Sequence, residues 1–391
     1  MDEAPVEIAV VGAGITGMAM ALALAKAGRN VTLLSAGPLP TRAPDQPPDG
    51  RTAALLQPAI ELLIRQGVFD PTGLGAEPLY RLRIVNQADP AAPSITFDAA
   101  EIGLDAFGWN IPNAGLAAAL AGAVRKSPAI TVCADAALSS VVETRDRLIL
   151  RAGQHRLAAR LVIGADGRNS VVRETAAIPT TEKDRGQTAI VCRFAHARPH
   201  RNISTELHKR GGPFTMVPLP GRNSSLVWVD TDAKSAERLA MTDRAFLSAM
   251  AVHATPWLGE IGSVSARHAY PIRARLAKAL TAPRRALIGE AAHVMSPLGA
   301  QGLNLSLRDV QTLANLLADH PGDPGDDTLL AAYASARNTD VKTRFWGVDT
   351  LNMLVKGSLP PFRQASSLAL GLLDSLPPAR RLLMQGLMQG A

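Results

Sequence analysis

The stretch Ile8-Ala-Val-Val-Gly-Ala-Gly-Ile-Thr-Gly17 places the pattern G-x-G-x-x-G directly after an apolar run that is typical of a buried strand. A run rich in alanine, leucine and methionine follows at residues 18–26 and predicts a helix. In such a strand, turn and helix, Gly12 permits the tight turn, Gly14 lets the backbone approach a pyrophosphate, and Gly17 lets the helix pack on the strand. The helix N-terminus then directs free N–H groups at phosphates. The stretch therefore predicts a dinucleotide-binding β-α-β unit.

The second strand of this unit is predicted at residues 30–34, and Ser35 follows it. Dinucleotide sites usually carry Asp or Glu at this position, where the carboxylate accepts hydrogen bonds from ribose hydroxyls. A serine bonds a hydroxyl without a charge and so makes a weaker contact. An NADP-type site needs a nearby arginine for the 2′-phosphate, and the nearest, Arg42, lies beyond the Pro/Gly-rich segment 37–40. We therefore expect a flavin dinucleotide, with Ser35 at its ribose.

Length and composition limit the class of protein. The 391 residues suffice for two or three structural units, and a hydrophobic content of 47% is ordinary for a globular chain. No stretch reaches the roughly 18 uninterrupted apolar residues of a membrane span. The acidic start lacks the features of a signal peptide, so we expect a cytoplasmic protein. Cys133 and Cys192 lie far apart and the eight histidines form no ligand pattern, so no metal site is predicted.

The net charge of +7 raises the question of an anionic partner. The basic residues are scattered along the chain, and aromatic residues make up only 4% of it, which is too few for base-stacking platforms. We therefore expect no nucleic acid as a partner. Attraction of anionic dinucleotides or of an anionic membrane surface accounts better for the charge.

The predicted elements show that the dinucleotide-binding part is interrupted. Apolar patterns predict helices at 52–67 and 113–126, a buried strand at 160–163, strands through 185–270 with one helix at about 234–252, and long helices at about 301–318, 327–353 and 364–388. We therefore predict an α/β fold in which a β-sheet substrate domain interrupts a Rossmann-like domain and helices follow. The expected FAD-binding parts are 1–75, 105–180 and 273–345, the substrate-domain parts are 76–104 and 181–272, and the C-terminal helical segment is 346–391.

Two further stretches carry the pattern of a strand that ends in a ligand-binding turn. Residues 161–173 deliver the pair Asp166-Gly167 to a turn, and Ser170 is placed to cap the helix that follows. Residues 286–309 deliver Gly289 and Glu290, then a Pro/Gly-rich loop, then another helix start. The N–H groups of such a helix start suit an anionic flavin edge. We therefore expect three distant stretches to bind one ligand.

Taken together, these stretches resemble the class A flavoprotein monooxygenases, the aromatic hydroxylases, over nearly the full length of the chain. Within that class the chain is most similar to the ubiquinone-biosynthesis hydroxylases. The similarity lies in Arg51-Thr-Ala-Ala-Leu55, Trp109-Asn-Ile-Pro-Asn-Ala114, Gly186-Gln-Thr-Ala-Ile-Val191, Gly212-Pro-Phe214 with Pro218-Leu-Pro220, and Leu298-Gly-Ala-Gln-Gly-Leu-Asn-Leu-Ser-Leu-Arg-Asp309.

The resemblance implies FAD as the cofactor, with NADH or NADPH as co-substrate. Gly12, Gly14 and Gly17 match the glycines that bind the ADP half, and Arg51 matches an arginine that contacts FAD. The pair Asp166-Gly167 matches the Asp-Gly pair linked in such enzymes to both FAD and NAD(P)H.

The third stretch matches the family's contacts to the flavin end of the cofactor. Gly289 matches the glycine of the ribityl-binding Gly-Asp pair, and Glu290 stands where the family has Asp. Pro297 matches the proline beside the isoalloxazine. The loop under the pyrimidine ring is matched by Gly299, Gln301, Gly302 and Asn304. Pro297 with this loop is the expected catalytic environment of the flavin.

Several positions depart from the family's pattern. Ser35 replaces an acidic residue, and Glu290 is one methylene longer than the usual Asp. Ser296 precedes Pro297 where relatives often have a second proline, and Ser306 replaces a common glycine. The sequence shows no dedicated acid–base pair, and His293, His268 and Tyr270 are expected to serve packing rather than catalysis.

The resemblance implies hydroxylation of an electron-rich ring by a flavin C4a-hydroperoxide formed from NAD(P)H and O2, with a polyprenylated phenol from ubiquinone biosynthesis as substrate. A soluble aromatic substrate and a non-catalytic flavin-fold scaffold of a quinone-biosynthesis protein complex remain alternatives. In the C-terminal segment, apolar residues beside Arg363, Arg380 and Arg381 fit either a peripheral contact with the inner face of the membrane or packing on the body.

Overall fold

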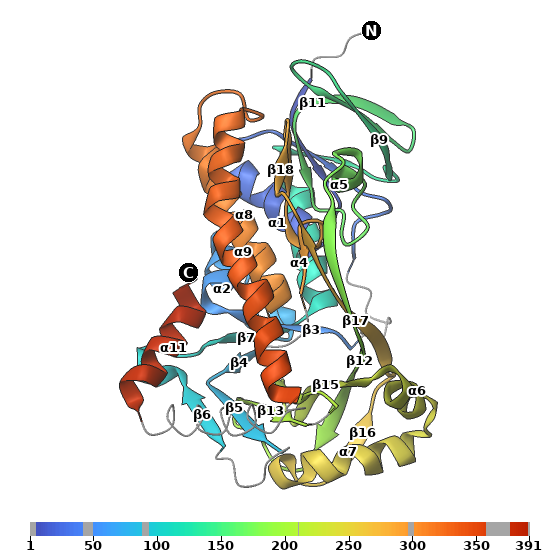
Figure 1. The fold of residues 1–391 in the computed structure, drawn as a ribbon, viewed down its shortest axis with the longest axis vertical. Helices are drawn as coiled ribbons and strands as arrows, with labels where there is room; N and C mark the ends of the chain where they lie inside the picture. The colour runs from blue at the N-terminus through green and yellow to red at the C-terminus, as the bar shows by residue number, and fades with distance from the viewer. Residues whose placement is uncertain are drawn as a thin grey trace.

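The computed structural model describes residues 5–41, 50–87, 94–209, 211–295, 301–356 and 376–389. Two large sheets divide these residues between an upper and a lower part in Figure 1. Pro297 and Gly299 of the expected flavin loop, Arg42, and residues 364–375 of the last expected helix lie outside the described ranges.

The upper part is the predicted Rossmann-like unit. Its sheet has the order β18-β19-β11-β1-β2-β8, and a hairpin of β9 and β10 extends β11. Parallel pairing places Val11, at the end of β1, beside both Leu34 of β2 and Gly164 of β11. The strands are β18 (Thr281–Ala282), β19 (Arg285–Leu287), β11 (His155–Gly164), β1 (Val6–Val11), β2 (Val31–Leu34), β8 (Ile130–Cys133), β9 (Leu138–Glu143) and β10 (Leu148–Ala152).

Helices cover this sheet because its strands are apolar on both faces. The helix α1 (Ile15–Lys26) packs between α4 (Asn113–Lys126) and α8 (Gln301–Asp319). The short helix α5 (Val171–Thr175) is capped by Ser170, whose hydroxyl accepts a hydrogen bond from the Arg173 N–H, which confirms the predicted cap.

The lower part is a mostly antiparallel sheet in the order β20-β17-β12-β15-β14-β13-β5-β6, with β16 on β12. The predicted boundary between residues 272 and 273 falls inside β17. The strands are β20 (His293–Val294), β17 (His268–Ala277), β12 (Thr180–His196), β15 (Asn223–Thr231), β14 (Phe214–Leu219), β13 (Ile203–His208), β5 (Arg81–Asn86), β6 (Ile95–Asp98) and β16 (Ile261–Val264).

Two helices, rather than the one expected at about 234–252, follow the last strand of this hairpin series. They are α6 (Asp232–Ala240) and α7 (Asp243–Leu258). The Thr242 hydroxyl accepts a hydrogen bond from the Ala245 N–H and so caps a new helix start. The single-helix prediction was therefore wrong, because a local cap divides a continuous apolar pattern.

The helix expected over residues 52–67 is also divided. Residues Thr52–Leu56 form β3, which pairs with β7 (Gly108–Pro112), and β7 pairs in turn with β4 (Glu77–Leu79). Only Gln57–Arg65 form a helix, α2, with Pro58 in its first turn. Gly108 permits the close pairing, since a Cβ at this position would lie 1.8 Å from the Leu55 carbonyl oxygen. The short elements α3 (Pro71–Leu74) and η1 (Ala99–Ile102) complete this region.

The C-terminal helices join the two parts. The long helix α9 (Asp327–Lys356) packs on α8 and β18, and further along it buries Val341 and Phe345 against Leu276 of β17 (Figure 1). Within the last expected helix, at about 364–388, the described helix α11 (Pro377–Gln389) begins at the pair Pro377-Pro378.

A buried charge network ties α8 and α9 to the turn η2 (Gly289–Ala291) and to β20. Both oxygens of Asp309 are engaged: Oδ2 accepts from the Gly289 N–H at 2.9 Å and lies 2.6 Å from His293 Nε2, and Oδ1 accepts from Arg337 Nε at 2.8 Å. Arg337 in turn donates to Asp340 at 2.6 Å. The His293 side chain is fully buried, so it holds structure, as expected, and has no access to a substrate.

The same network sets the ionisation of Asp309. Burial raises the pKa of this carboxyl, but the charge and hydrogen bond of His293, the Arg337 guanidinium and the Gly289 N–H together hold its pKa below the ordinary value. Asp309 is therefore a carboxylate in the folded protein at neutral pH.

We expect Asp309→Asn to lower the free energy of unfolding by about 3–5 kcal/mol, because it removes one of the two carboxylates that compensate the buried Arg337 charge and the acceptor of His293 and of the Gly289 N–H. Urea denaturation measures this change, and Asp319→Asn, at an exposed position of the same helix, is the control. Because folding lowers the Asp309 pKa, its stabilisation is complete above the unfolded value of about 3.9 and is lost as the pH falls through the folded value. The difference in free energy of unfolding between wild type and Asp309→Asn should therefore narrow below about pH 4. If Asp309→Asn is as stable as wild type at pH 7, the Asp309 charge does not anchor the network.

Candidate flavin site

The first stretch forms a turn in which each glycine has a different environment. At Gly12, with φ of +104°, a Cβ would lie 2.4 Å from the Ala165 carbonyl oxygen, and at Gly17 a Cβ would lie 1.8 Å from the Gly12 carbonyl oxygen. At Gly14, a Cβ would meet no atom within 4 Å. Packing therefore requires glycine at 12 and 17, whereas Gly14 borders open space.

The start of α1 offers backbone donors to that open space. Gly14 is the N-cap of α1, and no side chain caps the helix there. The first N–H groups of a helix have no partner within it, and the helix dipole favours an anion beside them. This arrangement fits a pyrophosphate, as the sequence predicted.

Ser35 lies at the end of β2, next to this turn, since the Gly12 N–H donates to the Leu34 carbonyl at 2.9 Å. Its side chain is buried, and its hydroxyl donates to the Gly37 carbonyl oxygen at 2.6 Å. The hydroxyl proton is therefore used within the turn, and the oxygen lone pairs are what Ser35 can present to a ribose hydroxyl.

The second stretch lies directly against the first. The Ala165 N–H donates to the Val11 carbonyl at 2.8 Å, and a Cβ on Gly12 would lie 2.9 Å from the Asp166 Cα. Asp166 Oδ2 accepts from the Val172 N–H at 3.1 Å, whereas its buried Oδ1 accepts no hydrogen bond from the residues that the structure describes. A buried acceptor without a partner is costly, so a ligand hydroxyl would satisfy it. Gly167 follows with φ of +79° and room around its Cα.

The third stretch touches both of the others. Gly289 has φ of +59°, and a Cβ there would lie 3.0 Å from Thr16 Cγ2 and 3.3 Å from Ser306 Oγ. Glu290, with about half of its side chain exposed, lies 3.7 Å from Arg168 Nε, next to the Asp166-Gly167 turn. The three stretches that the sequence grouped thus meet around one place in the fold.

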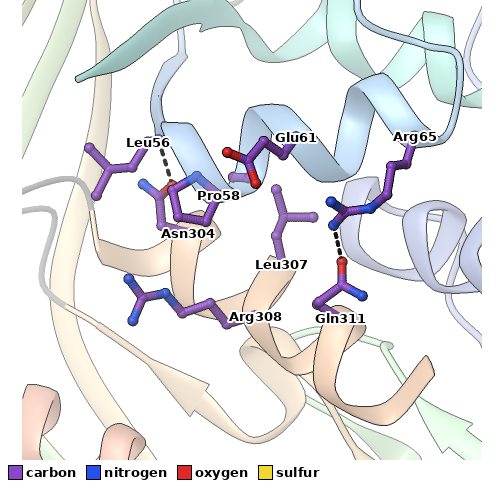
Figure 2. Close-up of a pocket in the computed structure, with 9 residues that line it drawn as sticks. Leu56, Pro58, Glu61, Arg65, Asn304, Leu307, Arg308 and Gln311 are labelled. Carbon is purple, nitrogen blue, oxygen red and sulfur yellow. Dashed lines mark hydrogen bonds between the residues drawn. The ribbon is translucent and has the colours of Figure 1, made fainter. Parts of the chain in front are cut away.

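Two polar side chains at the start of α8 are engaged by neighbouring elements. Gln301 Oε1 accepts from Arg344 Nη1 at 2.9 Å, which holds α8 to α9. The Asn304 amide accepts from the Leu56 N–H at 2.8 Å (Figure 2). It also donates to the Ala54 carbonyl at 2.8 Å, and the two bonds hold α8 to β3. Gly302 has room around its Cα. We therefore expect Gln301 and Asn304 to position the loop, with N–H groups near Gly302 facing the ligand.

Arg51, which the sequence predicted to contact FAD, lies beside the lower sheet, and the strand β3 that follows it is held to the start of α8 by Asn304. The Arg51 guanidinium lies 5.6 Å from the centre of the Tyr270 ring on β17, and the next residue, Thr52, places Oγ1 3.0 Å from Ser225 Oγ on β15. The segment thus connects the expected cofactor site to one face of the lower sheet.

A small cavity of about 200 Å³ lies between α2 and α8, and Asn304 is one of the residues that line it (Figure 2). Arg308 on its wall also donates to the Met388 carbonyl of α11 at 3.3 Å. Ligand pockets usually measure roughly 300 Å³ or more, so we assign this cavity no ligand. Its lining consists of Leu56, Pro58, Ala59, Glu61, Arg65, Asn304, Leu307, Arg308 and Gln311.

Comparisons with known proteins agree with this geometry. A family model described as FAD binding domain matches residues 5–344. The chain is 33% identical to a ubiquinone hydroxylase of Rhodospirillum rubrum, across 97% of this chain and 88% of that protein. It is 32% identical to the 3-demethoxyubiquinol 3-hydroxylase of Escherichia coli, across 95% of each chain. Its fold is similar to that of p-nitrophenol 4-monooxygenase from Pseudomonas putida, with a TM-score of 0.79 at 18% identity over 99% and 98% of the two chains.

We expect Gly14→Val to abolish binding of the flavin without unfolding the protein. The backbone at Gly14, with φ of −73° and ψ of 178°, suits any residue, and the added side chain enters only the space that the ligand needs. The flavin content of purified protein and the thermal unfolding midpoint measure the two effects.

Gly122→Val, on α4, is the matched control, because a side chain there also meets no atom within 4 Å, and it should keep the flavin. Gly17→Val should prevent folding instead. A Gly14→Val protein that retains its full flavin content would show that the site is wrongly placed.

Proposed function

Because the chain belongs to the FAD-binding-domain family of flavoprotein monooxygenases, we propose that it hydroxylates the aromatic ring of a polyprenylated phenol in ubiquinone biosynthesis, with NADH or NADPH as reductant and O2 as the oxygen source. The α/β fold and FAD as the cofactor, both expected from the sequence, are confirmed. The observation that supports the proposal most strongly is the meeting of Gly12, Asp166 and Gly289, since it brings stretches more than a hundred residues apart to one place in the fold.

Bound FAD supplies the redox chemistry that activates O2, and the protein supplies orientation and electrostatics. The α1 start binds the pyrophosphate, the orphaned Asp166 oxygen accepts from a hydroxyl of the cofactor, and the α8 start faces the flavin edge. Pro297 and Gly299 complete the flavin environment in this proposal, together with Glu290 at the ribityl chain. The described side chains of the site include no acid–base pair, and the chemistry of the flavin requires none from this part of the protein.

Deletion of the gene should cause a ubiquinone precursor that lacks one ring hydroxyl to accumulate, and mass spectrometry of the extracted quinones identifies it. The wild-type chain should restore ubiquinone, and Gly14→Val, which lacks the flavin, should not. Restoration by the flavin-free variant would favour a scaffold in a quinone-biosynthesis complex. Normal ubiquinone after deletion would instead favour a soluble aromatic substrate.

We also propose that α11 brings the protein to the membrane, where a polyprenylated substrate resides. Met384 and Met388 pack against Phe97 and Phe107, so one side of α11 belongs to the body of the protein. The opposite side carries Leu382, which is 72% exposed. The exposed Arg381 precedes it, and an apolar residue beside a basic one suits an anionic bilayer. Among the described residues, no helix has the length and hydropathy needed to span a membrane.

We expect Leu382→Glu to reduce co-sedimentation with anionic liposomes severalfold, because it replaces an exposed apolar contact by a charge that the surface repels. Val252→Glu is the matched control: Val252 is 71% exposed on α7, away from α11, and should have no effect. Truncation after about residue 360 should lower binding in the same way and retain FAD. Equal binding by Leu382→Glu and wild type would leave α11 with its packing role alone.

A further inference from the structure

The lower sheet has two faces with different chemistry around β13 and β14. Leu207, Phe214, Met216 and Trp228 point to one face, where they pack against Phe246 and Met250 of α7. Side chains alternate along a strand, so Glu206 and Thr215, which lie between these residues, point to the other face. The pairing register places Glu206 opposite Thr215, and Thr215 opposite Val227 of β15.

This second face is turned toward the flavin-binding part. Ser225 lies two residues before Val227 on β15, on the same face, and its hydroxyl is 3.0 Å from that of Thr52, next to Arg51. Tyr270, which lies opposite Ala189 on β17, contacts the Arg51 guanidinium. The face that carries Glu206 is therefore the one that the expected FAD contacts approach.

Aliphatic side chains on the paired strands lie beside Glu206, which makes this carboxylate conspicuous. Its neighbours across the sheet include Ile84 of β5, which lies opposite Glu206, and Val217, Val227 and Val229. A partly buried carboxylate needs polar partners. Glu206 Oε1 has one in His208 Nε2, at 2.6 Å, whereas Oε2 has only the Thr215 hydroxyl at 3.5 Å among the described residues. About a fifth of the Glu206 side chain is exposed, so the described residues do not cover it completely.

We propose that Glu206 is a catalytic residue that accepts the hydrogen bond of the substrate's phenolic hydroxyl, and that His208 is the positioning residue that holds it. The inference rests on the proposed function, to which it adds the residue that recognises the ring. The hydroxyl donates to Oε2, and its proton passes to the carboxylate as the negative charge passes to the phenol oxygen. Phenolate formation raises the electron density at the ring carbons ortho and para to that oxygen, which electrophilic hydroxylation requires. The proton returns to the product as it leaves.

The neighbouring strands add no second ionisable group to this pair. β5 places Ile84 beside Glu206, and β14 places Thr215 there, so His208 is the ionisable partner that the described residues provide. Its buried ring donates to Oε1 and leaves Oε2 for the substrate. The apolar residues around the pair exclude water from the ring, which strengthens the charge-assisted hydrogen bond.

The test uses the FAD-loaded protein, NAD(P)H and a phenol that carries a two-isoprene chain. Glu206→Gln should retain FAD and the unfolding midpoint and form hydroxylated product about 100-fold more slowly at pH 7, the scale of a lost general base. More of the NAD(P)H should then yield H2O2. Product formation by this variant should recover partly toward pH 10, where phenols with a pKa of about 10 ionise without help. His208→Phe should lower the rate less, and Glu237→Gln, on the exposed side of α6, should have no effect.

Wild-type product formation by Glu206→Gln, or loss of FAD or of folding in it, would overturn the proposal, since Glu206 would then be irrelevant or only structural. An unchanged deficit at high pH would exclude proton acceptance. The change in flavin absorbance when the phenol is added measures phenol binding independently of product formation. If wild type binds the phenol and does not hydroxylate it, the proposed function fails. Weaker phenol binding by Glu206→Gln than by wild type would then still show that Glu206 contacts the hydroxyl, and equal binding would show that it does not.

Discussion

A buried carboxylate, that of Asp309, joins elements that the chain makes far apart. It accepts hydrogen bonds from the η2 backbone at Gly289, from His293 on β20 and from Arg337 on α9. A charge that is removed from water remains stable only if such partners compensate it, so the three elements cannot separate without leaving ions uncompensated. Asp309 is therefore a common anchor beneath the expected cofactor site. It holds the third flavin-binding stretch, the start of α8, and α9 where this helix crosses both sheets.

Close backbone packing places the other two stretches relative to this anchor. Gly12 and Gly17 bring the first turn against the start of α1 and against Ala165, and Gly289 lies against Thr16. Parallel strands end at the same edge of a sheet, which is where open α/β folds bind ligands. Because the contacts at Gly12 and Gly17 are with backbone atoms, small shifts are not available, and the site is preorganised before the ligand arrives.

The sequence predicted the elements whose signal is local. The G-x-G-x-x-G turn, the helix over residues 113–126 and the Ser170 cap each depend on neighbouring residues, and the structure confirms them. The strand β3 was missed because it depends on pairing with β7, whose paired residues are 52 to 60 positions away, which a helical apolar pattern cannot reveal. Asp309 was missed as an ionic anchor because an aspartate on an amphipathic helix looks like a surface residue until Arg337 and His293 are placed beside it. The side-chain roles of Gln301 and Asn304, which bind α9 and β3, likewise needed tertiary contacts.

The lower sheet packs against α7 on one face and carries Glu206 on the other, and this division links the proposed ring chemistry to the proposed membrane contact. The α7 face is filled by aromatic and aliphatic side chains, so a ligand can approach only the opposite face. On that face Glu206 lies opposite Ile84, and Ile84 packs in the cluster that α11 closes with Met384 and Met388. A phenol whose hydroxyl reaches Glu206 therefore has an apolar surface beside it that leads over β5 to α11. An amphiphilic substrate fits this arrangement. Its polar head meets the Glu206 carboxylate, and its tail follows β5 toward α11, the helix proposed to contact the bilayer.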